Sequence, residues 1–173
     1  MDAEGRLFAR FREMGIAWQS VEHEPTFTVA ESRHLAQSLP GSRSKSLLLT
    51  DKDGRLTLVT ALGSVKVDIK KVGQAISARG RLSFASPEVM QSVLGVAPGH
   101  LTPLALINNQ ARRLGNVVLD AALMEHDPVW AHPLRNTAST GIAGADLQRF
   151  CELHARQVSI LPLAQPAPSS HVR

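Results

Sequence analysis

Two short segments of this sequence hold residue types that could bind a small polar group or act on it. The first is the loop of residues 99–103, which begins at Gly99 and ends at Pro103. Pro103, and Pro98 just before the loop, fix φ and lack a backbone donor, while Gly99 permits a positive φ or a close approach by another molecule. Amides and carbonyls that face one way in such a loop could hold a polar group, although an ordinary connection has the same composition.

The second segment, residues 132–140, concentrates side-chain donors and acceptors: His132, Asn136, Ser139 and Thr140. A turn capped by an Asx or hydroxyl side chain would contain the same residue types. Lys45 is a further candidate, because it stands directly before residues 46–50, an apolar run that predicts a buried strand. A solvated lysine at the end of a strand is the alternative interpretation of that position.

Common catalytic and metal-binding signatures are absent from the sequence. It contains no Walker A loop, no G-x-G-x-x-G, no G-x-S-x-G elbow and no H-E-x-x-H. No two histidines are four residues apart, and the single cysteine, Cys151, excludes an internal disulfide and does not favour a cysteine-based zinc site. We therefore expect no metal and no cofactor. An enzyme built on this chain would act through positioning and backbone dipoles.

The charge of the chain is mildly basic, with a net charge of +4 over 173 residues and a pI of about 9.8. Its densest basic cluster is either a solvated face or a rim that meets a polyphosphate backbone; it consists of Lys66, Lys70, Lys71, Arg79 and Arg81. Five Phe, two Trp and no Tyr argue against a base-stacking platform for nucleic acid. The sequence has no apolar run of about 18 residues and no signal-peptide pattern, so we expect a cytoplasmic protein without a membrane partner.

The elements that must position these residues alternate between helices and strands. Apolar spacing and end signals predict helices over residues 2–14, 30–38, 68–76, 87–94 and 145–155. Strands are expected over residues 16–21, 46–50, 55–61, 104–107, 117–119, 129–132 and 158–161, with a hairpin at 46–61, a short turn or helix at 121–125 and a loop over 133–141. The pattern indicates one mixed α/β domain over residues 1–163, followed by a disordered tail over 164–173.

Three of these stretches together resemble the YbaK/ProX family of prolyl-tRNA editing domains. Residues 43–49, Arg-Ser-Lys-Ser-Leu-Leu-Leu, look like the lysine-bearing strand of that family. Residues 99–103 look like its G-x-x-x-P loop, and residues 132–140 look like its C-terminal His/Asn/Thr segment. The resemblance covers residues 1 to 163. It implies a mixed α/β fold with a central, largely antiparallel, barrel-like sheet flanked by helices.

The resemblance also implies a reaction and a set of roles. The reaction is hydrolysis of the aminoacyl ester on a mischarged tRNA, with catalytic roles for Lys45, Gly99 and His132. Lys45 would contact the phosphate of the 3′-terminal nucleotide, and the amides around residues 99–101 would hold the aminoacyl carbonyl or amine. The 2′-hydroxyl of the terminal adenosine would orient or activate water, and His132 would act as a base or a positioning group. The rest of the pocket would consist of His100, Leu101, Thr102, Pro103, Asn136, Ser139 and Thr140.

The partner implied by the resemblance is the acceptor end of tRNA-Pro, with prolyl-tRNA synthetase as a candidate protein partner. Alanine is the favoured amino acid, because a small second pocket can remove what a synthetase cannot exclude. Cysteine, or another mischarged tRNA, is the alternative substrate. A non-catalytic nucleic-acid-binding module of the same fold is the alternative from a different class.

Overall fold

The computed structural model describes residues 1–25, 41–109 and 112–164. The chain begins with helix α1 (Ala3–Met14), as the apolar spacing predicts. The Asp2 side chain accepts a hydrogen bond from the amide of Gly5 at its start, and Gly15 ends it with a left-handed φ of 68°. Leu7 and Phe11 are fully buried, so this helix contributes one apolar face to the core.

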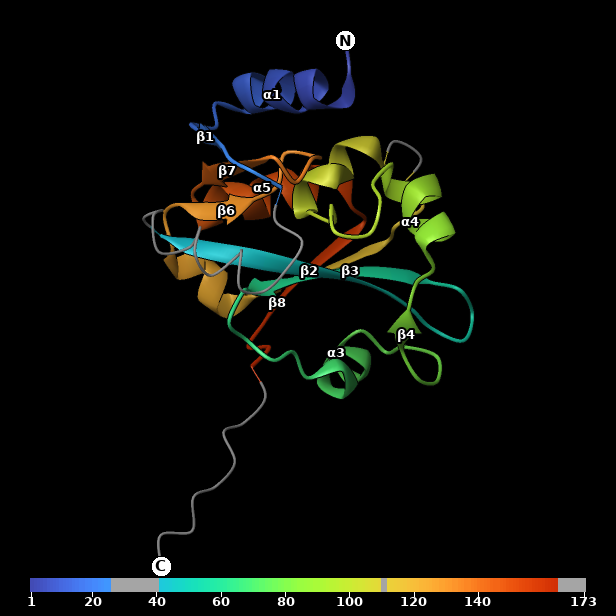
Figure 1. Ribbon diagram of the computed structural model, residues 1–173. Coiled ribbons are helices and arrows are strands. Elements are labelled where there is room, and N and C mark those ends of the chain that lie inside the picture. Colours follow the sequence, from blue (N-terminus) through green and yellow to red (C-terminus); the bar gives the residue numbers. More distant parts are fainter. Residues whose placement is uncertain (26–40, 110–111, 165–173) are drawn as a thin grey trace, which may run out of the picture.

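A mixed sheet of eight strands forms the centre of the molecule (Figure 1). The hydrogen-bonded order is β1-β7-β6-β2-β3-β5-β8, with β4 paired to β2. Between the described strands, four pairings are antiparallel and three are parallel, so the sheet is mixed with a narrow antiparallel majority. The strands are β1 (Gln19–Glu22), β2 (Ser42–Thr50), β3 (Leu56–Leu62), β4 (Ser83–Phe84), β5 (Asn116–Asp120), β6 (Val129–Ala131), β7 (Ala138–Ile142) and β8 (Gln157–Leu161).

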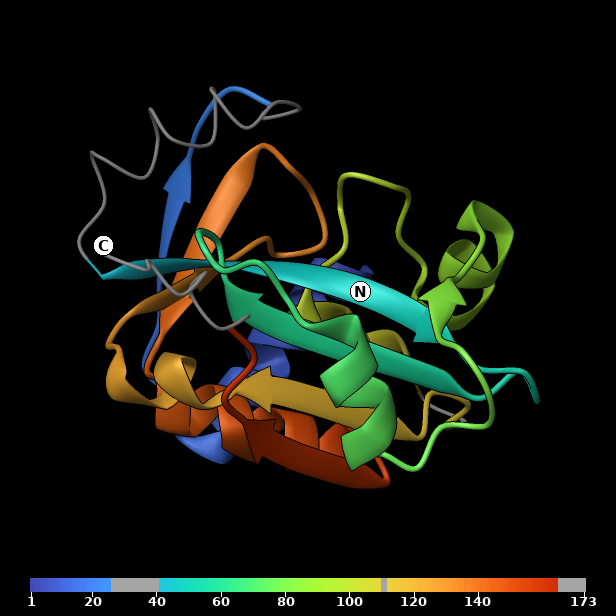
Figure 2. The same cartoon turned by 90° about the horizontal axis from the view of Figure 1, so that it is seen from below.

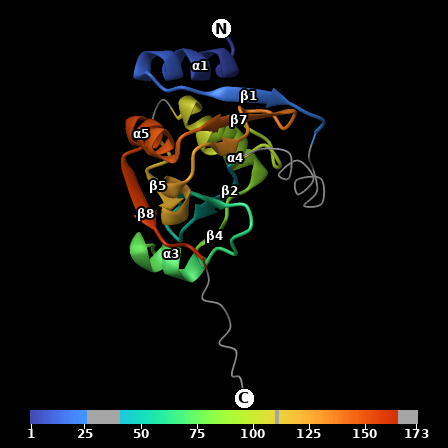
Figure 3. The same cartoon turned by 90° about the vertical axis from the view of Figure 1, so that its left-hand side faces the viewer.

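Two apolar clusters cover the two faces of this sheet. The larger one packs α1, α4 (Pro87–Leu94) and α5 (Gly144–His154) against one face. The smaller one joins α3 (Ile69–Ala75) to the other face, where Val72 is fully buried. Figures 1 and 3 show α1 and α3 on opposite sides of the sheet, and Figure 2 shows α3 lying across it. In the described part of the chain, no helix has the length and apolar character needed to cross a bilayer.

The strand predicted over residues 104–107 is wrong, because this run forms the 3₁₀ helix η1 (Pro103–Asn108). The hydroxyl of Thr102 accepts a hydrogen bond from the amide of Leu104, and Pro103 occupies the first turn. Both are helix-start signals. A short, wholly buried apolar run has no periodicity that separates strand from helix, which explains the error.

The loop predicted over residues 133–141 is also wrong in its second half, since Ala138–Ile142 is strand β7. Its small residues are needed there, because a Cβ at Gly141 would lie 3.1 Å from the Trp130 ring. The other predicted elements are present, with bounds shifted by a few residues, and a second 3₁₀ helix, η2 (Ala121–Glu125), fills the predicted turn. Ala164 bridges to Val67, while the predicted helix of residues 30–38 and the tail after 164 lie outside the described residues.

Candidate active site

A small pocket lies where the start of β2 meets the ends of β6 and β7 and the residues that lead into η1. The empty space within it, which includes open solvent, is about 250 Å³. Of the residues predicted from the sequence, the structure brings five together here: Leu101, Thr102, Pro103, His132 and Ser139. The remaining lining residues are Arg43, Ser44, Ser46, Trp130 and Ala131.

The protonation state of His132 is set by one hydrogen bond and by burial. Its Nδ1 lies 3.1 Å from the carbonyl oxygen of Ala138. A carbonyl can only accept, so Nδ1 carries the proton and Nε2 of the neutral ring has a free lone pair. Burial lowers the pKa of His132, and the nearby charges of Arg43, His23 and His100 lower it further against the effect of the Ala138 bond. His132 is therefore held as a neutral acceptor beside the pocket.

Ser139 has a partner that the sequence analysis missed. Nε2 of His23 lies 2.9 Å from its hydroxyl oxygen. The two residues meet because β1 pairs with β7, with Val21 opposite Ser139. The available signal was a second histidine just after a predicted strand and two residues before a proline, in the sequence Glu22-His-Glu-Pro25. The strand pairing that makes this histidine part of the site is not readable from the sequence.

The G-x-x-x-P loop has a tight turn before the pocket. The amide of His100 donates to the carbonyl of Ala97 at 3.0 Å, and Gly99 has a φ of 87°. Pro followed by Gly with a positive φ is the pattern of a type II turn. The His100 amide is thus already used, which leaves Gly99, Leu101 and Thr102 as loop amides without an acceptor among the described residues. Neither Gly99 nor His100 lines the pocket itself.

Lys45 does not itself line the pocket, although its neighbours Arg43, Ser44 and Ser46 in β2 do. Its cross-strand partner Ala61 belongs to the smaller apolar cluster, together with Leu49. Burial lowers the pKa of Lys45, which has no hydrogen-bond or ion-pair partner within residues 1–25, 41–109 and 112–164. Its predicted phosphate contact remains a prediction.

Asn136 and Thr140 are buried near the pocket without lining it. The Thr140 hydroxyl lies 2.8 Å from that of Ser20, so it links β7 to β1. Asn136 is 4% exposed, and its Nδ2 has no acceptor among the described residues. The Thr140 hydroxyl therefore contacts a neighbouring strand, and the Asn136 amide is an unused donor within the described part of the chain; the binding roles predicted for both stay predictions.

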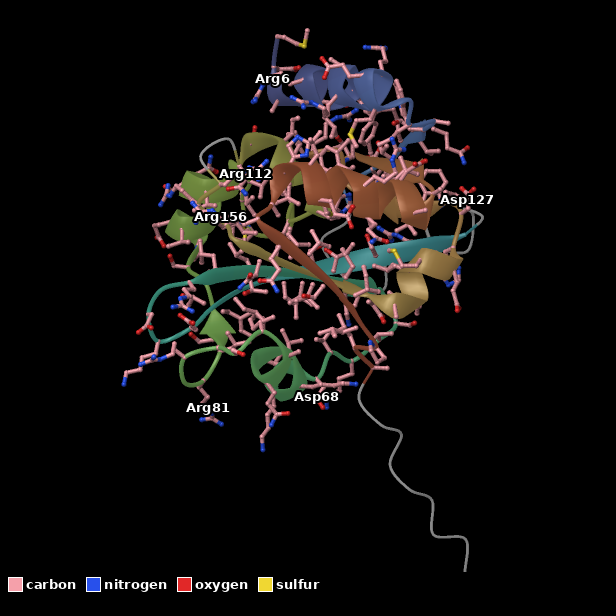
Figure 4. The ribbon with its side chains drawn as sticks, turned by 180° about the vertical axis from the view of Figure 1, so that it is seen from behind. Arg6, Asp68, Arg81, Arg112, Asp127 and Arg156 are labelled. Carbon is pink, nitrogen blue, oxygen red and sulfur yellow. The ribbon has the colours of Figure 1, made fainter. Side chains whose placement is uncertain are left out.

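No residue of the predicted tRNA-binding cluster lines the pocket. Lys70 and Lys71 are on α3, which packs against the face of the sheet opposite α1. The Lys71 ammonium donates to the carbonyl of Pro162 at 2.8 Å, and Arg79 pairs with Asp53 at 3.7 Å. Figure 4 shows Arg81 at the α3 end of the molecule and Arg6 at the α1 end. A tRNA that contacted both the pocket and this cluster would have to pass around the edge of the sheet.

The fold agrees with what comparison with known proteins shows. The model of the family described as "Aminoacyl-tRNA editing domain" matches residues 23–150, and the chain belongs to this family, as the resemblance predicted. Prolyl-tRNA synthetase associated domain-containing protein 1 of Bos taurus is 35% identical over 150 residues, which cover 83% of this chain and 85% of that protein.

Two further proteins extend the match over almost the whole chain. The prolyl-tRNA editing protein ProX of Acetoanaerobium sticklandii is 28% identical over 164 residues, covering 94% of this chain and 99% of that protein. A crystal structure of a protein proposed to be a trans-editing enzyme for prolyl-tRNA synthetase superimposes with a TM-score of 0.72 at 22% identity. It covers 96% of this chain and 99% of its own, and it supports the fold.

Proposed function

We propose that this protein is an aminoacyl-tRNA deacylase that removes the wrong amino acid from mischarged tRNA-Pro, with alanyl-tRNA-Pro as its substrate. The observation that carries the proposal is the pocket in which residues 101–103 meet a neutral His132. The chain belongs to the aminoacyl-tRNA editing domain family, and one relative of similar length is named a prolyl-tRNA editing protein.

The pocket residues suit the hydrolysis of an ester that is already activated. The free amides of Leu101 and Thr102, which line the pocket, can donate to the oxyanion that develops on the ester carbonyl, and the Gly99 amide lies in the turn just before them. One such donor is worth about 3–4 kcal/mol in other hydrolases. Nε2 of His132 can accept a hydrogen bond from the attacking water or from the 2′-hydroxyl of the terminal adenosine. Lys45 would hold the terminal phosphate, for which a point charge on a flexible stem is enough.

A small amino acid is proposed because selection by size works through two pockets. A synthetase pocket built for proline cannot exclude smaller side chains by size, and a second, smaller pocket can then remove them. Alanine, which is smaller than proline and has no polar side-chain atom, fits this logic.

The test is deacylation of alanyl-, cysteinyl- and prolyl-tRNA-Pro by the purified protein, with Lys45→Ala beside the wild type. We expect rapid loss of alanine only, and a strong decrease in the variant. Loss of cysteine instead would keep the reaction and replace the substrate. Binding of tRNA without hydrolysis of any of the three esters would contradict the proposal and favour a non-catalytic module.

A further inference from the structure

We propose that Ser139 is a catalytic residue of this site and that His23 is the positioning residue that takes up its proton. The inference rests on the proposed deacylation and adds two residues to its machinery. Ser139 lines the pocket and is 1% exposed. It is therefore a buried hydroxyl that faces the site, rather than a surface side chain.

The backbone holds His23 firmly beside Ser139. β1 pairs with β7 from Gln19 opposite Gly141 to Glu22 opposite Ala138. The amide of His23 then continues this ladder by donating to the carbonyl of Thr137 at 2.9 Å. The side chain of a residue fixed in this way has little freedom to leave the end of the sheet.

The partners of the two His23 ring nitrogens determine which nitrogen donates and which accepts. Nδ1 lies 2.8 Å from the carbonyl oxygen of Glu24, so Nδ1 donates its proton to that acceptor. Nε2 of the neutral ring is then an acceptor, and the Ser139 hydroxyl donates to it over 2.9 Å. A hydroxyl bonded to an imidazole that a third group orients is the arrangement that activates oxygen nucleophiles and relays protons.

The two histidines hold neighbouring residues of the same strand. His132 donates to the carbonyl of Ala138, and His23 accepts from the side chain of Ser139. Their ring centroids are 6.4 Å apart. The lone pairs of the Ser139 oxygen that do not face His23 can accept a hydrogen bond from a water molecule in the pocket.

The step that this pair would perform is proton transfer during attack of water on the ester. An O–H bond of the water breaks as its oxygen bonds to the carbonyl carbon. Its proton passes to the Ser139 oxygen while the Ser139 proton passes to Nε2 of His23. The bond between the carbonyl carbon and the ribose oxygen then breaks, and that oxygen recovers the proton along the same path. The products are the free amino acid and tRNA with an intact terminal ribose, and no other reactant is needed.

The test compares side chains of equal shape at position 139 in single-turnover deacylation. Ser139→Thr keeps the hydroxyl, whereas Ser139→Val replaces it with a methyl group. We expect the Val variant to lose about 100-fold in rate relative to the Thr variant, within the range for general acid–base catalysis. Its affinity for tRNA should be unchanged. Ser20→Ala, which removes the hydroxyl bonded to Thr140, is the control and should keep the wild-type rate. Equal rates for the Thr and Val variants would overturn the proposal.

His23 needs a readout that a structural role would not change. We expect His23→Ala to lose about 100-fold in rate and to regain part of it with added imidazole, because a free base can replace the missing one. Imidazole should not restore Ser139→Val. Loss of rate in His23→Ala that imidazole does not relieve would reduce His23 to a structural residue and overturn its part of the proposal.

A tRNA-free substrate separates failure of this proposal from failure of the proposed function. The p-nitrophenyl ester of alanine presents the same carbonyl group without any nucleotide. If the wild type cleaves this ester with the same dependence on residues 139 and 23 but leaves all tRNA-Pro esters intact, the pair stands and the tRNA substrate is wrong. If the wild type deacylates tRNA and the Thr and Val variants match it, the function stands and the pair is wrong.

Discussion

The protonation state of the His132 ring is set by its immediate surroundings. The Ala138 carbonyl fixes the proton on Nδ1, and burial keeps the ring neutral. The same carbonyl belongs to the residue that precedes Ser139, so the histidine and the strand hold each other in place. The site therefore contains an acceptor, Nε2 of His132, that is held in place and stays unprotonated near neutral pH.

Replacing His132 with Asn tests the value of that nitrogen. The Asn amide can still donate to the Ala138 carbonyl, but nothing occupies the position of Nε2. We expect single-turnover deacylation to fall by about 100-fold, with little change in thermal stability, because only the acceptor in the pocket is lost. A decrease of less than about threefold would show that Nε2 takes no part in the reaction.

Buried histidines also make the stability depend on pH. Burial lowers the pKa of both His132 and His154. Nδ1 of His154 donates to the Phe150 carbonyl at 2.8 Å, and its buried Nε2 has no partner among the described residues. In the unfolded chain both rings titrate near about 6.5. Below that pH the unfolded state binds more protons than the folded state, so stability falls as the pH falls.

We therefore expect the free energy of unfolding to decrease from pH 7 to pH 5, and His154→Leu to reduce the size of that decrease. Urea titrations across this range would measure it. His126→Leu is the control, because the His126 ring bonds the Ser42 hydroxyl and, among the described residues, has no buried nitrogen without a partner. An identical pH dependence in wild type and His154→Leu would show that His154 is not responsible.

At the scale of elements, one side chain ties three segments together around the site. Arg135 lies between β6 and β7 and donates to Glu4 of α1 at 3.0 Å and to Glu22 of β1 at 2.7 Å. It also donates to the Thr137 hydroxyl at 2.8 Å. The two carboxylates raise the pKa of Arg135. Since Glu22 precedes His23, this fork braces the strand end that carries the histidine.

Arg135→Lys should weaken this brace although it keeps the charge, because an ammonium group cannot reproduce the planar fork. We expect deacylation to fall by about tenfold through poorer positioning of residues 132–139. Faster hydrogen exchange in this segment should accompany the decrease. Normal exchange with reduced activity would contradict this explanation. Arg149→Lys, which changes an exposed pair with Asp146, is the matched control.

The turn before the pocket allows a separate test of the G-x-x-x-P loop. A Cβ at Gly99 would meet no atom within 4 Å, so the positive φ alone requires glycine there in the free protein. Gly99→Ala should cost about 1–2 kcal/mol in the free energy of unfolding. If the loop amides contact the substrate closely, deacylation should fall by more than tenfold, beyond what stability explains. A change in stability without a change in rate would remove Gly99 from the site.

The elements with explicit end signals were predictable, and those set by distant partners were not. Ser86 and Gly95 cap α4 as the sequence indicates. By contrast, β7 exists because β1 and β6 pair with its small polar residues, and no local pattern shows this. The side of the sheet on which Lys45 lies could not be predicted for a related reason. The residues that follow it in β2 are buried on both sides of the sheet and do not alternate in polarity. Half of the residues that line the pocket were found through motifs, and the contact of His23 with Ser139 was missed because it depends on strand pairing.

At the scale of the whole molecule, the sheet lies between the pocket and Lys70 of the predicted tRNA-binding cluster. The pocket is next to the larger apolar cluster, whereas Lys70 lies on the α3 side. Binding of a polyanion far from the reacting ester would raise affinity without affecting the chemical step. The salt dependence of binding is the property that distinguishes such a contact, because each neutralised phosphate releases counterions.

Lys70→Glu should therefore weaken tRNA binding at low salt and leave the deacylation rate at saturating tRNA unchanged. Lys70 is the residue to change, because Lys71 also donates to the Pro162 carbonyl and its loss would disturb the fold. The slope of log K against log salt should decrease by about 0.7–0.9 for one lost phosphate contact. Arg156→Glu makes the same change of charge at a position that Figure 4 shows away from α3. Equal weakening by both variants would assign the effect to net charge and would contradict a tRNA contact on α3.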